Sequence, residues 1–223
     1  MPGYHFDPRV ILQQLPALAD GLRLTLVVSA IGMAGAFLVG LAGGAACALN
    51  LPLLRWAVPA YVEVFRNTPL LVQIFFLYFA LPEIGVKLSG FTVAWLALVL
   101  WGGAYNTENF RAGFEAVERG YREAARALGL GTWQTFATVV LPLGLRTALP
   151  STTNTLISVL KNSSFMVAIG FPELTDTTVS IVSLTFRVFE LFGVIGVVYL
   201  VLAWALSALM RGVERRLALP AAH

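Results

Sequence analysis

Polar and charged side chains lie inside apolar stretches of the chain, where each of them is costly to bury. Asn154, Ser158 and Lys161 recur at helical spacing, so they share one side of a helix. In a low-dielectric cavity, the Lys161 ammonium and the Glu108 carboxylate are suited to hold the two ends of a small zwitterion. The candidate pathway residues for a small polar solute are Thr68, Tyr105, Glu108, Asn154, Ser158, Lys161 and Asn162.

The same residue types also have a structural interpretation. In that alternative, Lys161 pairs with Glu108 or another carboxylate, or caps helix carbonyls, and so holds helices together. Glu63 and Arg66, one helical turn apart, are predicted to form an ion pair rather than a binding site. Pro69 is predicted to kink the helix in which it lies.

Membrane-spanning helices must position these side chains. The 223 residues are 58% hydrophobic and only 12% charged, whereas soluble domains are about 25% charged. Because lipid cannot satisfy exposed backbone groups, apolar runs of about 20 residues must be helices. We predict an all-α membrane protein with five transmembrane helices, at Leu24–Leu49, Tyr61–Leu81, Phe91–Ala112, Leu149–Gly170 and Phe189–Met210.

Two details of these runs carry further predictions. The fourth run is the most polar, so it must face protein or a water-filled path. Glycines crowd the first run and predict close packing of that helix rather than a gating role. They are Gly32, Gly35, Gly40, Gly43 and Gly44.

Basic residues predict the orientation, because Lys and Arg are retained on the cytoplasmic side. With the N-terminus outside, the inner side collects Arg55, Arg66, Arg111, Arg119, Arg122, Arg126, Arg146, Arg211, Arg215 and Arg216. The outer side holds Arg9, Arg23, Lys87 and Arg187. We therefore expect the N-terminus outside and the C-terminus inside. The pI of about 9.3 then reflects contact with anionic lipid rather than nucleic acid.

Several classes of enzyme are excluded by missing motifs. The sequence contains no Gly-x-x-x-x-Gly-Lys-Ser/Thr loop for nucleotide phosphates, no Gly-x-Ser-x-Gly elbow and no His-Glu-x-x-His pair. Cys47 is the single cysteine, so an internal disulfide is impossible and a thiolate metal site is implausible. We expect no catalytic, cofactor or metal site, and any energy must come from a partner.

A polar helical segment interrupts the apolar sequence between the third and fourth runs. Tyr121, Ala124, Ala125 and Leu128 fall at i, i+3, i+4 and i+7, which predicts a shallow apolar strip on one side of a short helix. Gly129 permits a sharp turn after it. The segment is suited to docking into a cleft of another protein, and the alternative is an amphipathic helix at the membrane surface.

The sequence of this segment resembles the cytoplasmic coupling loop of ABC importer permeases. Glu123-Ala124-Ala125, three residues, Gly129, nine residues, then Val139 and Leu141-Pro142 match the Glu-Ala-Ala pattern, with Val139 in place of Ile. Further blocks resemble the polar amino acid subfamily, at 61–73, 103–113 and 160–164. Within them, Asn67, Asn109, Ala112, Asn162 and Ser163 depart from the common pattern.

The resemblance implies the transmembrane subunit of a type I importer of polar amino acids such as His, Glu, Gln, Arg or opine-like solutes. It implies a second permease subunit in a homo- or heterodimer, two ATPase subunits that use ATP, a periplasmic solute-binding protein and a bacterial inner membrane. The residues expected to couple to the ATPase are Glu123, Ala124, Ala125, Leu128 and Gly129.

The expected organisation is a single transmembrane domain at 23–217 with its coupling segment at about 117–142. An uncleaved, amphipathic periplasmic segment at 1–22 precedes it, and a cytoplasmic tail at 218–223 follows. Two other classes of function compete with the importer: an ATP-independent secondary transporter or channel, and a structural membrane subunit without a pathway. The isolated Glu108 is the only hint of an ion-coupled relay, and the polar side of the fourth run argues against the structural subunit.

Overall fold

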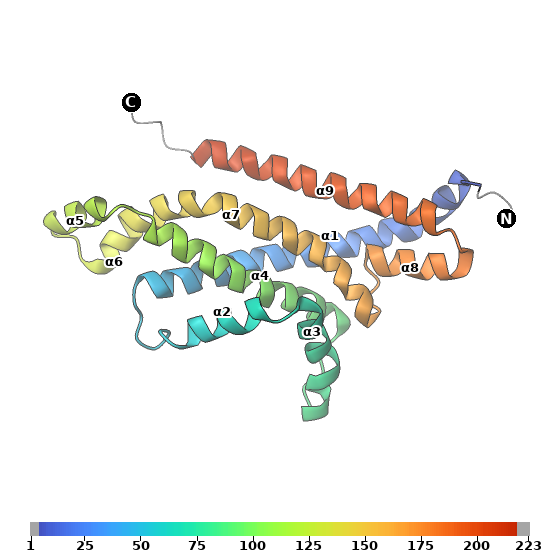
Figure 1. Ribbon diagram of the computed structural model, residues 1–223, viewed down its shortest axis with the longest axis horizontal. Coiled ribbons are helices and arrows are strands. Elements are labelled where there is room, and N and C mark those ends of the chain that lie inside the picture. Colours follow the sequence, from blue (N-terminus) through green and yellow to red (C-terminus); the bar gives the residue numbers. More distant parts are fainter. Residues whose placement is uncertain (1–4, 218–223) are drawn as a thin grey trace.

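A computed structural model describes residues 5–217, and every regular element in that range is a helix, as predicted. In chain order the elements are α1 (Pro8–Ala48), α2 (Ala57–Asn67), α3 (Leu70–Phe75), η1 (Phe76–Ala80), η2 (Leu81–Ile84), α4 (Gly90–Glu115), α5 (Arg119–Ala127), α6 (Thr132–Thr135), η3 (Phe136–Val140), α7 (Leu141–Asn162), η4 (Ser163–Ile169), α8 (Leu174–Thr185) and α9 (Val188–Leu217). Figure 1 shows α1, α4, α7 and α9 running along the long axis of the bundle.

Helix α1 starts at Pro8, directly after Asp7, whose side chain accepts a hydrogen bond from the Arg9 amide at 3.0 Å. It continues through residue 22 although Pro16 lies inside it, so no break marks the expected boundary between the N-terminal segment and the first span. Its 41 residues give a length of about 60 Å, twice the hydrocarbon thickness of about 30 Å. The expected tail at 218–223 lies outside the described residues.

Glycines allow α1 to pack closely on α4. A Cβ at Gly44 would lie 2.6 Å from the Cβ of Phe110, and one at Gly43 would lie 2.5 Å from Oγ1 of Thr107. No real side chain tolerates these distances, so the two backbones approach because side chains are missing there. The predicted close packing is confirmed.

Helix α4 is covered on a second side by α7. Here a Cβ at Gly113 would lie 2.5 Å from the carbonyl oxygen of Gly144. Aromatic side chains continue this contact, with Phe114 edge-on to Phe136 at 5.3 Å between ring centroids. The centre of the molecule is therefore a three-helix unit of α1, α4 and α7.

A short helix and a buried carboxylate tie α9 to this unit. Helix α8 is a short helix of 12 residues that precedes α9. Glu173, fully buried at its N-terminus, accepts hydrogen bonds from the Asp176 amide at 2.9 Å, Tyr199 of α9 at 2.9 Å and Thr25 of α1 at 3.2 Å. One side chain thus joins α1, α8 and α9.

The predicted second span is broken. Helix α2 and the helical stretch Leu70–Ile84, which comprises α3, η1 and η2, are bent by 106° relative to each other. At the break, Thr68 is extended at φ −109° and ψ 140° before Pro69. Proline disfavours helical geometry in the residue before it, so the predicted kink at Pro69 is confirmed but the continuous helix over Tyr61–Leu81 is wrong. In Figure 1, α3 with η1 and η2 projects from the bundle as an arm.

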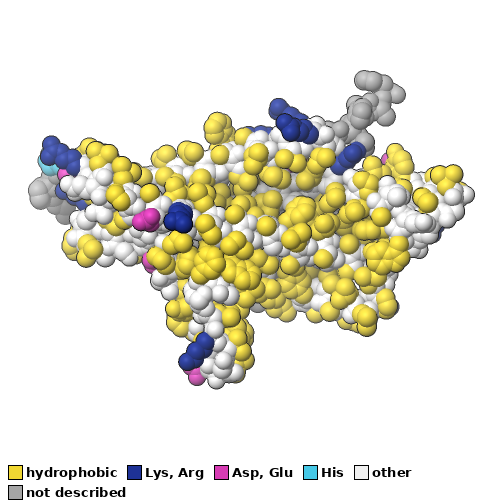
Figure 2. Space-filling view, turned by 180° about the vertical axis from the view of Figure 1, so that it is seen from behind, with side chains coloured by type: hydrophobic (Ala, Val, Ile, Leu, Met, Phe, Trp, Pro, Cys, Tyr) yellow, Lys and Arg dark blue, Asp and Glu magenta, His cyan; other side chains and the backbone are white. Residues whose placement is uncertain are grey.

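Length and composition mark fewer spans than the five predicted. Among the described residues, α1 and α9 are long and apolar enough to cross a membrane, and two bent pairs of helices raise the number to at most four. Helix α4 is not among them, because its second half carries Asn106, Thr107 and Glu108. Figure 2 shows apolar side chains over much of the visible face, with charged ones in small groups, at one end, along the upper edge and at the tip of the arm.

Candidate functional site

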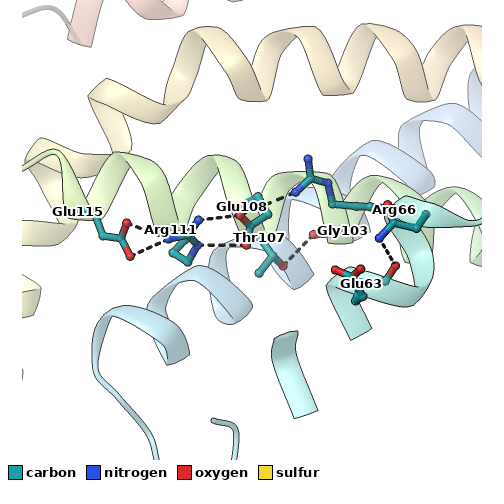
Figure 3. Close-up of polar contacts among 8 residues, drawn as sticks. Glu63, Arg66, Gly103, Thr107, Glu108, Arg111 and Glu115 are labelled. Atoms are coloured by element: carbon teal, nitrogen blue, oxygen red, sulfur yellow. Dashed lines mark hydrogen bonds and ion pairs between the residues drawn. The ribbon is translucent and has the colours of Figure 1, made fainter. Parts of the chain in front are cut away.

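The predicted pathway residues of α4 lie in a chain of charges. Arg111 donates to both carboxylate oxygens of Glu108, at 3.1 and 2.8 Å, and pairs with Glu115 at 2.8 Å. Arg66 of α2 reaches Glu108 from the other side, at 3.8 Å (Figure 3). The Glu108 carboxylate is therefore already neutralised within the chain, mainly by Arg111.

Arg66 also covers the ring of Tyr105, 5.1 Å from its centroid. The predicted ion pair between Glu63 and Arg66 is wrong, because Arg66 pairs with Glu108 instead. A hollow of about 380 Å³ opens here, lined by Val62, Glu63, Arg66, Asn67 and Tyr105. It combines both signs of charge with an amide and an aromatic ring.

Thr68 lies at the break between α2 and α3 and is held there by Gln73. The Gln73 side-chain amide donates to the carbonyls of Phe65 and Thr68 at 3.0 and 3.1 Å, and to Oγ1 of Thr68 at 2.9 Å. These bonds satisfy carbonyls that the break releases. No periodicity singles out Gln73, so sequence reasoning missed its role. An apolar groove of about 390 Å³ adjoins the break, with Val72 and Phe76 among its lining.

The predicted pathway residues of α7 form an accessible polar stripe. Asn154 and Lys161 are exposed, whereas Ser158 and Asn162 are partly buried. Ser158 donates its hydroxyl hydrogen bond to the Asn154 carbonyl at 3.0 Å. Within residues 5–217, Lys161 has no ion pair, so the suggested pairing with Glu108 is not formed.

An amide ladder connects the two polar helices. The Asn109 side chain of α4 donates to Oδ1 of Asn106 at 3.2 Å and to Oγ1 of Thr155 on α7 at 3.0 Å. Asn106 is fully buried, and its own side-chain N–H group has no partner in the described part of the chain. The position at which Asn109 departs from the common family pattern is therefore a contact between α4 and α7.

The predicted coupling residues lie on and directly after α5. Tyr121, Ala124 and Leu128 are exposed, with Leu128 at 83%. Ala125 is buried at 4% exposure, so the predicted four-residue strip is wrong at this position. A helix lying on its own protein must turn one side inward, and Ala125 is on that side.

Two features hold α5 in place. Arg122 donates a side-chain hydrogen bond to the Phe114 carbonyl in the last turns of α4. Gly129 has φ +83°, a left-handed conformation that ends the helix. On the outer side, Glu123 pairs with Arg119 at 2.8 Å, with both side chains largely exposed. Helix α5 is thus bonded to α4 on its inner side and accessible to solvent on its outer side.

The described chain is all-helical and largely apolar, and it carries polar side chains on α4 and α7, which are the features of a membrane transport component. The model of the family "Binding-protein-dependent transport system inner membrane component" matches residues 36–219. The chain belongs to this family. Its members are transport components rather than catalysts.

Named relatives are amino acid permeases. The chain is 36% identical over 214 residues to the glutamine transport system permease protein GlnP of Escherichia coli (strain K12), covering 95% of this chain and 98% of that protein. It is 40% identical over 162 residues to the probable glutamine ABC transporter permease protein GlnP of Bacillus subtilis (strain 168), covering 73% and 74%.

A solved structure of an amino acid ABC transporter with histidines has the same fold. One of its chains superposes with a TM-score of 0.87 at 32% identity, over 96% of this chain and 100% of that one. The architecture described above is therefore the type I ABC permease fold.

Proposed function

We propose that this chain is the membrane-spanning permease subunit of an ATP-driven, binding-protein-dependent importer of polar amino acids, with L-glutamine as the first candidate solute. The solute assignment rests on the names of the relatives at 36% and 40% identity. The observation that carries the coupling role is the exposure of Tyr121 and Ala124 on α5 and of Leu128 directly after it, while Ala125 faces the bundle.

The proposed topology has five spans, with the N-terminus periplasmic and the C-terminus cytoplasmic in a bacterial inner membrane. Charge supports it, because Arg119, Arg122 and Arg126 on and around α5 would then lie on the cytoplasmic side. Helix α4 counts as a span in this proposal. Its polar second half is sheltered by α1 and α7, which reduces its need for an apolar surface.

The proposed partners follow from surfaces that one copy leaves open. The accessible polar stripe of α7 is expensive against lipid, so a second permease subunit is expected to enclose the pathway with it. Two ATPase subunits would receive α5 of each permease. The helix α8, on the periplasmic side in this topology, is the proposed contact for the solute-binding protein.

The proposed coupling is mechanical. Nucleotide binding in the ATPase pair would move α5, and Arg122 connects α5 directly to the backbone of α4 through Phe114. Helix α4 is joined to α7 by Asn109 and Thr155, so the movement reaches both polar helices. This chain binds no cofactor in the proposal, and ATP is consumed by the partner.

Uptake into proteoliposomes tests the proposal. The permease is reconstituted with its cognate ATPase and binding protein, and accumulation of labelled L-glutamine and other amino acids is measured. A hydrolysis-deficient ATPase serves as the control. We expect uptake that disappears in the control, whereas undiminished uptake in the control would identify a channel or a secondary carrier.

A further inference from the structure

The hollow between α2 and α4 contains two charged groups that the protein leaves available. Arg66 is 40% exposed in its side chain. Its guanidinium lies 3.8 Å from Glu108 and donates no hydrogen bond within the described chain. Glu108 is served by shorter bonds from Arg111. Arg66 therefore keeps a fork of five N–H donors, the geometry that binds a carboxylate in bidentate fashion.

The opposite charge lines the same hollow. Glu63 precedes Arg66 by three residues on α2, so both lie on one side of the helix. Its carboxylate is exposed and forms no ion pair among residues 5–217. Figure 3 shows Glu63 and Arg66 together at the end of α2, beside α4. A carboxylate of this kind accepts hydrogen bonds from an ammonium group.

The remaining lining supplies orientation. The Asn67 side chain donates to the Glu63 carbonyl at 2.9 Å, which fixes the amide and leaves its Oδ1 as an acceptor. The Tyr105 ring lies under Arg66 and holds the guanidinium flat. The volume of about 380 Å³ falls in the range of small-molecule sites.

We propose that this hollow binds a zwitterionic α-amino acid, with its carboxylate on Arg66 and its ammonium on Glu63. This rests on the proposed function and adds the place where the permease itself holds the solute. In the proposed topology the hollow lies toward the cytoplasmic half of the pathway. It therefore serves as the last binding site of the solute before its release to the cytoplasm.

Direct binding tests the site without the periplasmic protein. Labelled L-glutamine is titrated onto the detergent-purified permease–ATPase complex, for the unmodified chain, Arg66→Gln and Glu63→Gln. We expect each substitution to weaken binding about tenfold or more, because a charge-assisted hydrogen bond is lost. The matched controls Arg55→Gln and Glu83→Gln, exposed charges outside the hollow, should bind as the unmodified chain does.

A solute that lacks the carboxylate tests whether Arg66 contacts that group. Glutamine α-amide has no α-carboxylate, so it should bind the unmodified complex more weakly than L-glutamine does. Arg66→Gln should not lower the affinity for this amide any further. Arg66→Lys, which keeps the charge but not the fork, should bind L-glutamine with intermediate affinity. Thermal unfolding of each complex shows whether the variant has assembled. If Arg66→Gln does not assemble, the site is tested by the affinity of Glu63→Gln for L-glutamine and by the affinity of the unmodified complex for the α-amide.

The outcomes separate this inference from the proposed function. Equal L-glutamine affinity in Arg66→Gln, Glu63→Gln and the unmodified complex overturns the site, even if ATP-dependent import by the unmodified assembly is intact. No binding by the unmodified complex up to millimolar L-glutamine also overturns it. Absence of ATP-dependent import of every amino acid tested contradicts the proposed function instead.

Discussion

At the scale of single residues, Gly129 shapes the end of the coupling helix through its backbone alone. Its φ is +83°, and nothing lies within 4 Å of a Cβ added there. Gly129→Ala therefore meets no steric neighbour but costs about 1 kcal/mol in this left-handed conformation. We expect about fivefold weaker binding of the ATPase subunit, measured by titrating it onto purified permease.

Asn is the control for this substitution, since it tolerates the left-handed conformation better than other residues with a side chain. Gly129→Asn should bind the ATPase nearly as the unmodified chain does. An Ala variant with unchanged affinity, or an Asn variant as weak as Ala, would contradict the conformational explanation.

Lys161 separates solute contact from a structural role. It is exposed and has no ion pair in the described part of the chain, so Lys161→Met should change the free energy of unfolding by no more than about 0.5 kcal/mol. We expect the same variant to lower uptake of L-glutamine. Lys87→Met is the matched control, and a Lys161 variant with unchanged uptake would remove this residue from the pathway.

Charge pairing is where residue-level prediction from sequence was least successful. Glu108 and Lys161 stand out in the sequence, because they interrupt apolar runs. The ion pairs were not predictable from the sequence, because Glu108 pairs with Arg111 on its own helix and with Arg66 of α2. Which of several nearby cations pairs with a carboxylate depends on side-chain geometry. The spacing of residues in the sequence does not determine that geometry.

At the scale of elements, Gln73 stabilises the break between α2 and α3. Gln73→Leu would leave the Phe65 and Thr68 carbonyls without the donors that now reach them. Loss of such bonds costs about 1–3 kcal/mol, so we expect a lower thermal unfolding temperature in detergent. Gln13→Leu, at an exposed position of α1, is the control, and equal stability of the two variants would contradict this role.

The contact between α1 and α4 gives opposite expectations for two glycines. Gly44→Ala places a Cβ 2.6 Å from that of Phe110, and such overpacking costs about 1–3 kcal/mol. Gly193 of α9 has open space around it, so Gly193→Ala should be neutral or stabilise by about 0.5–1 kcal/mol. Thermal unfolding of both variants in detergent checks this, and a similar loss in both would contradict the packing argument.

Helical composition and close packing of α1 were predictable, because apolar length and glycine clustering express them directly. The break was predictable only as a kink at Pro69, since its 106° angle depends on the bonds of Gln73 across it. The orientation of α5 was half predictable. Its periodicity identified an apolar strip, but which member, Ala125, would face the bundle depends on how the helix is seated.

At the scale of the whole molecule, the chain belongs to a family of transport-system components. The polar stripe of α7 and the exposed helix α5 lie on surfaces that a single copy does not cover. The apolar α9, with only 11% of its most apolar window buried, is suited to face lipid. The division of roles among these surfaces is the basis for the proposed assembly.

Leu128 gives the most direct test of the central claim, that α5 couples a separate ATPase to transport. Leu128→Glu places a charge where an apolar side chain, 83% exposed, would enter the partner, and burying an unpaired charge is costly. Leu53→Glu, at a leucine 93% exposed outside α5, is the matched control. Uptake of labelled L-glutamine and ATP hydrolysis are measured in the same proteoliposomes. We predict at least about a tenfold loss of both for Leu128→Glu and neither for Leu53→Glu; undiminished uptake in Leu128→Glu would contradict the coupling role of α5.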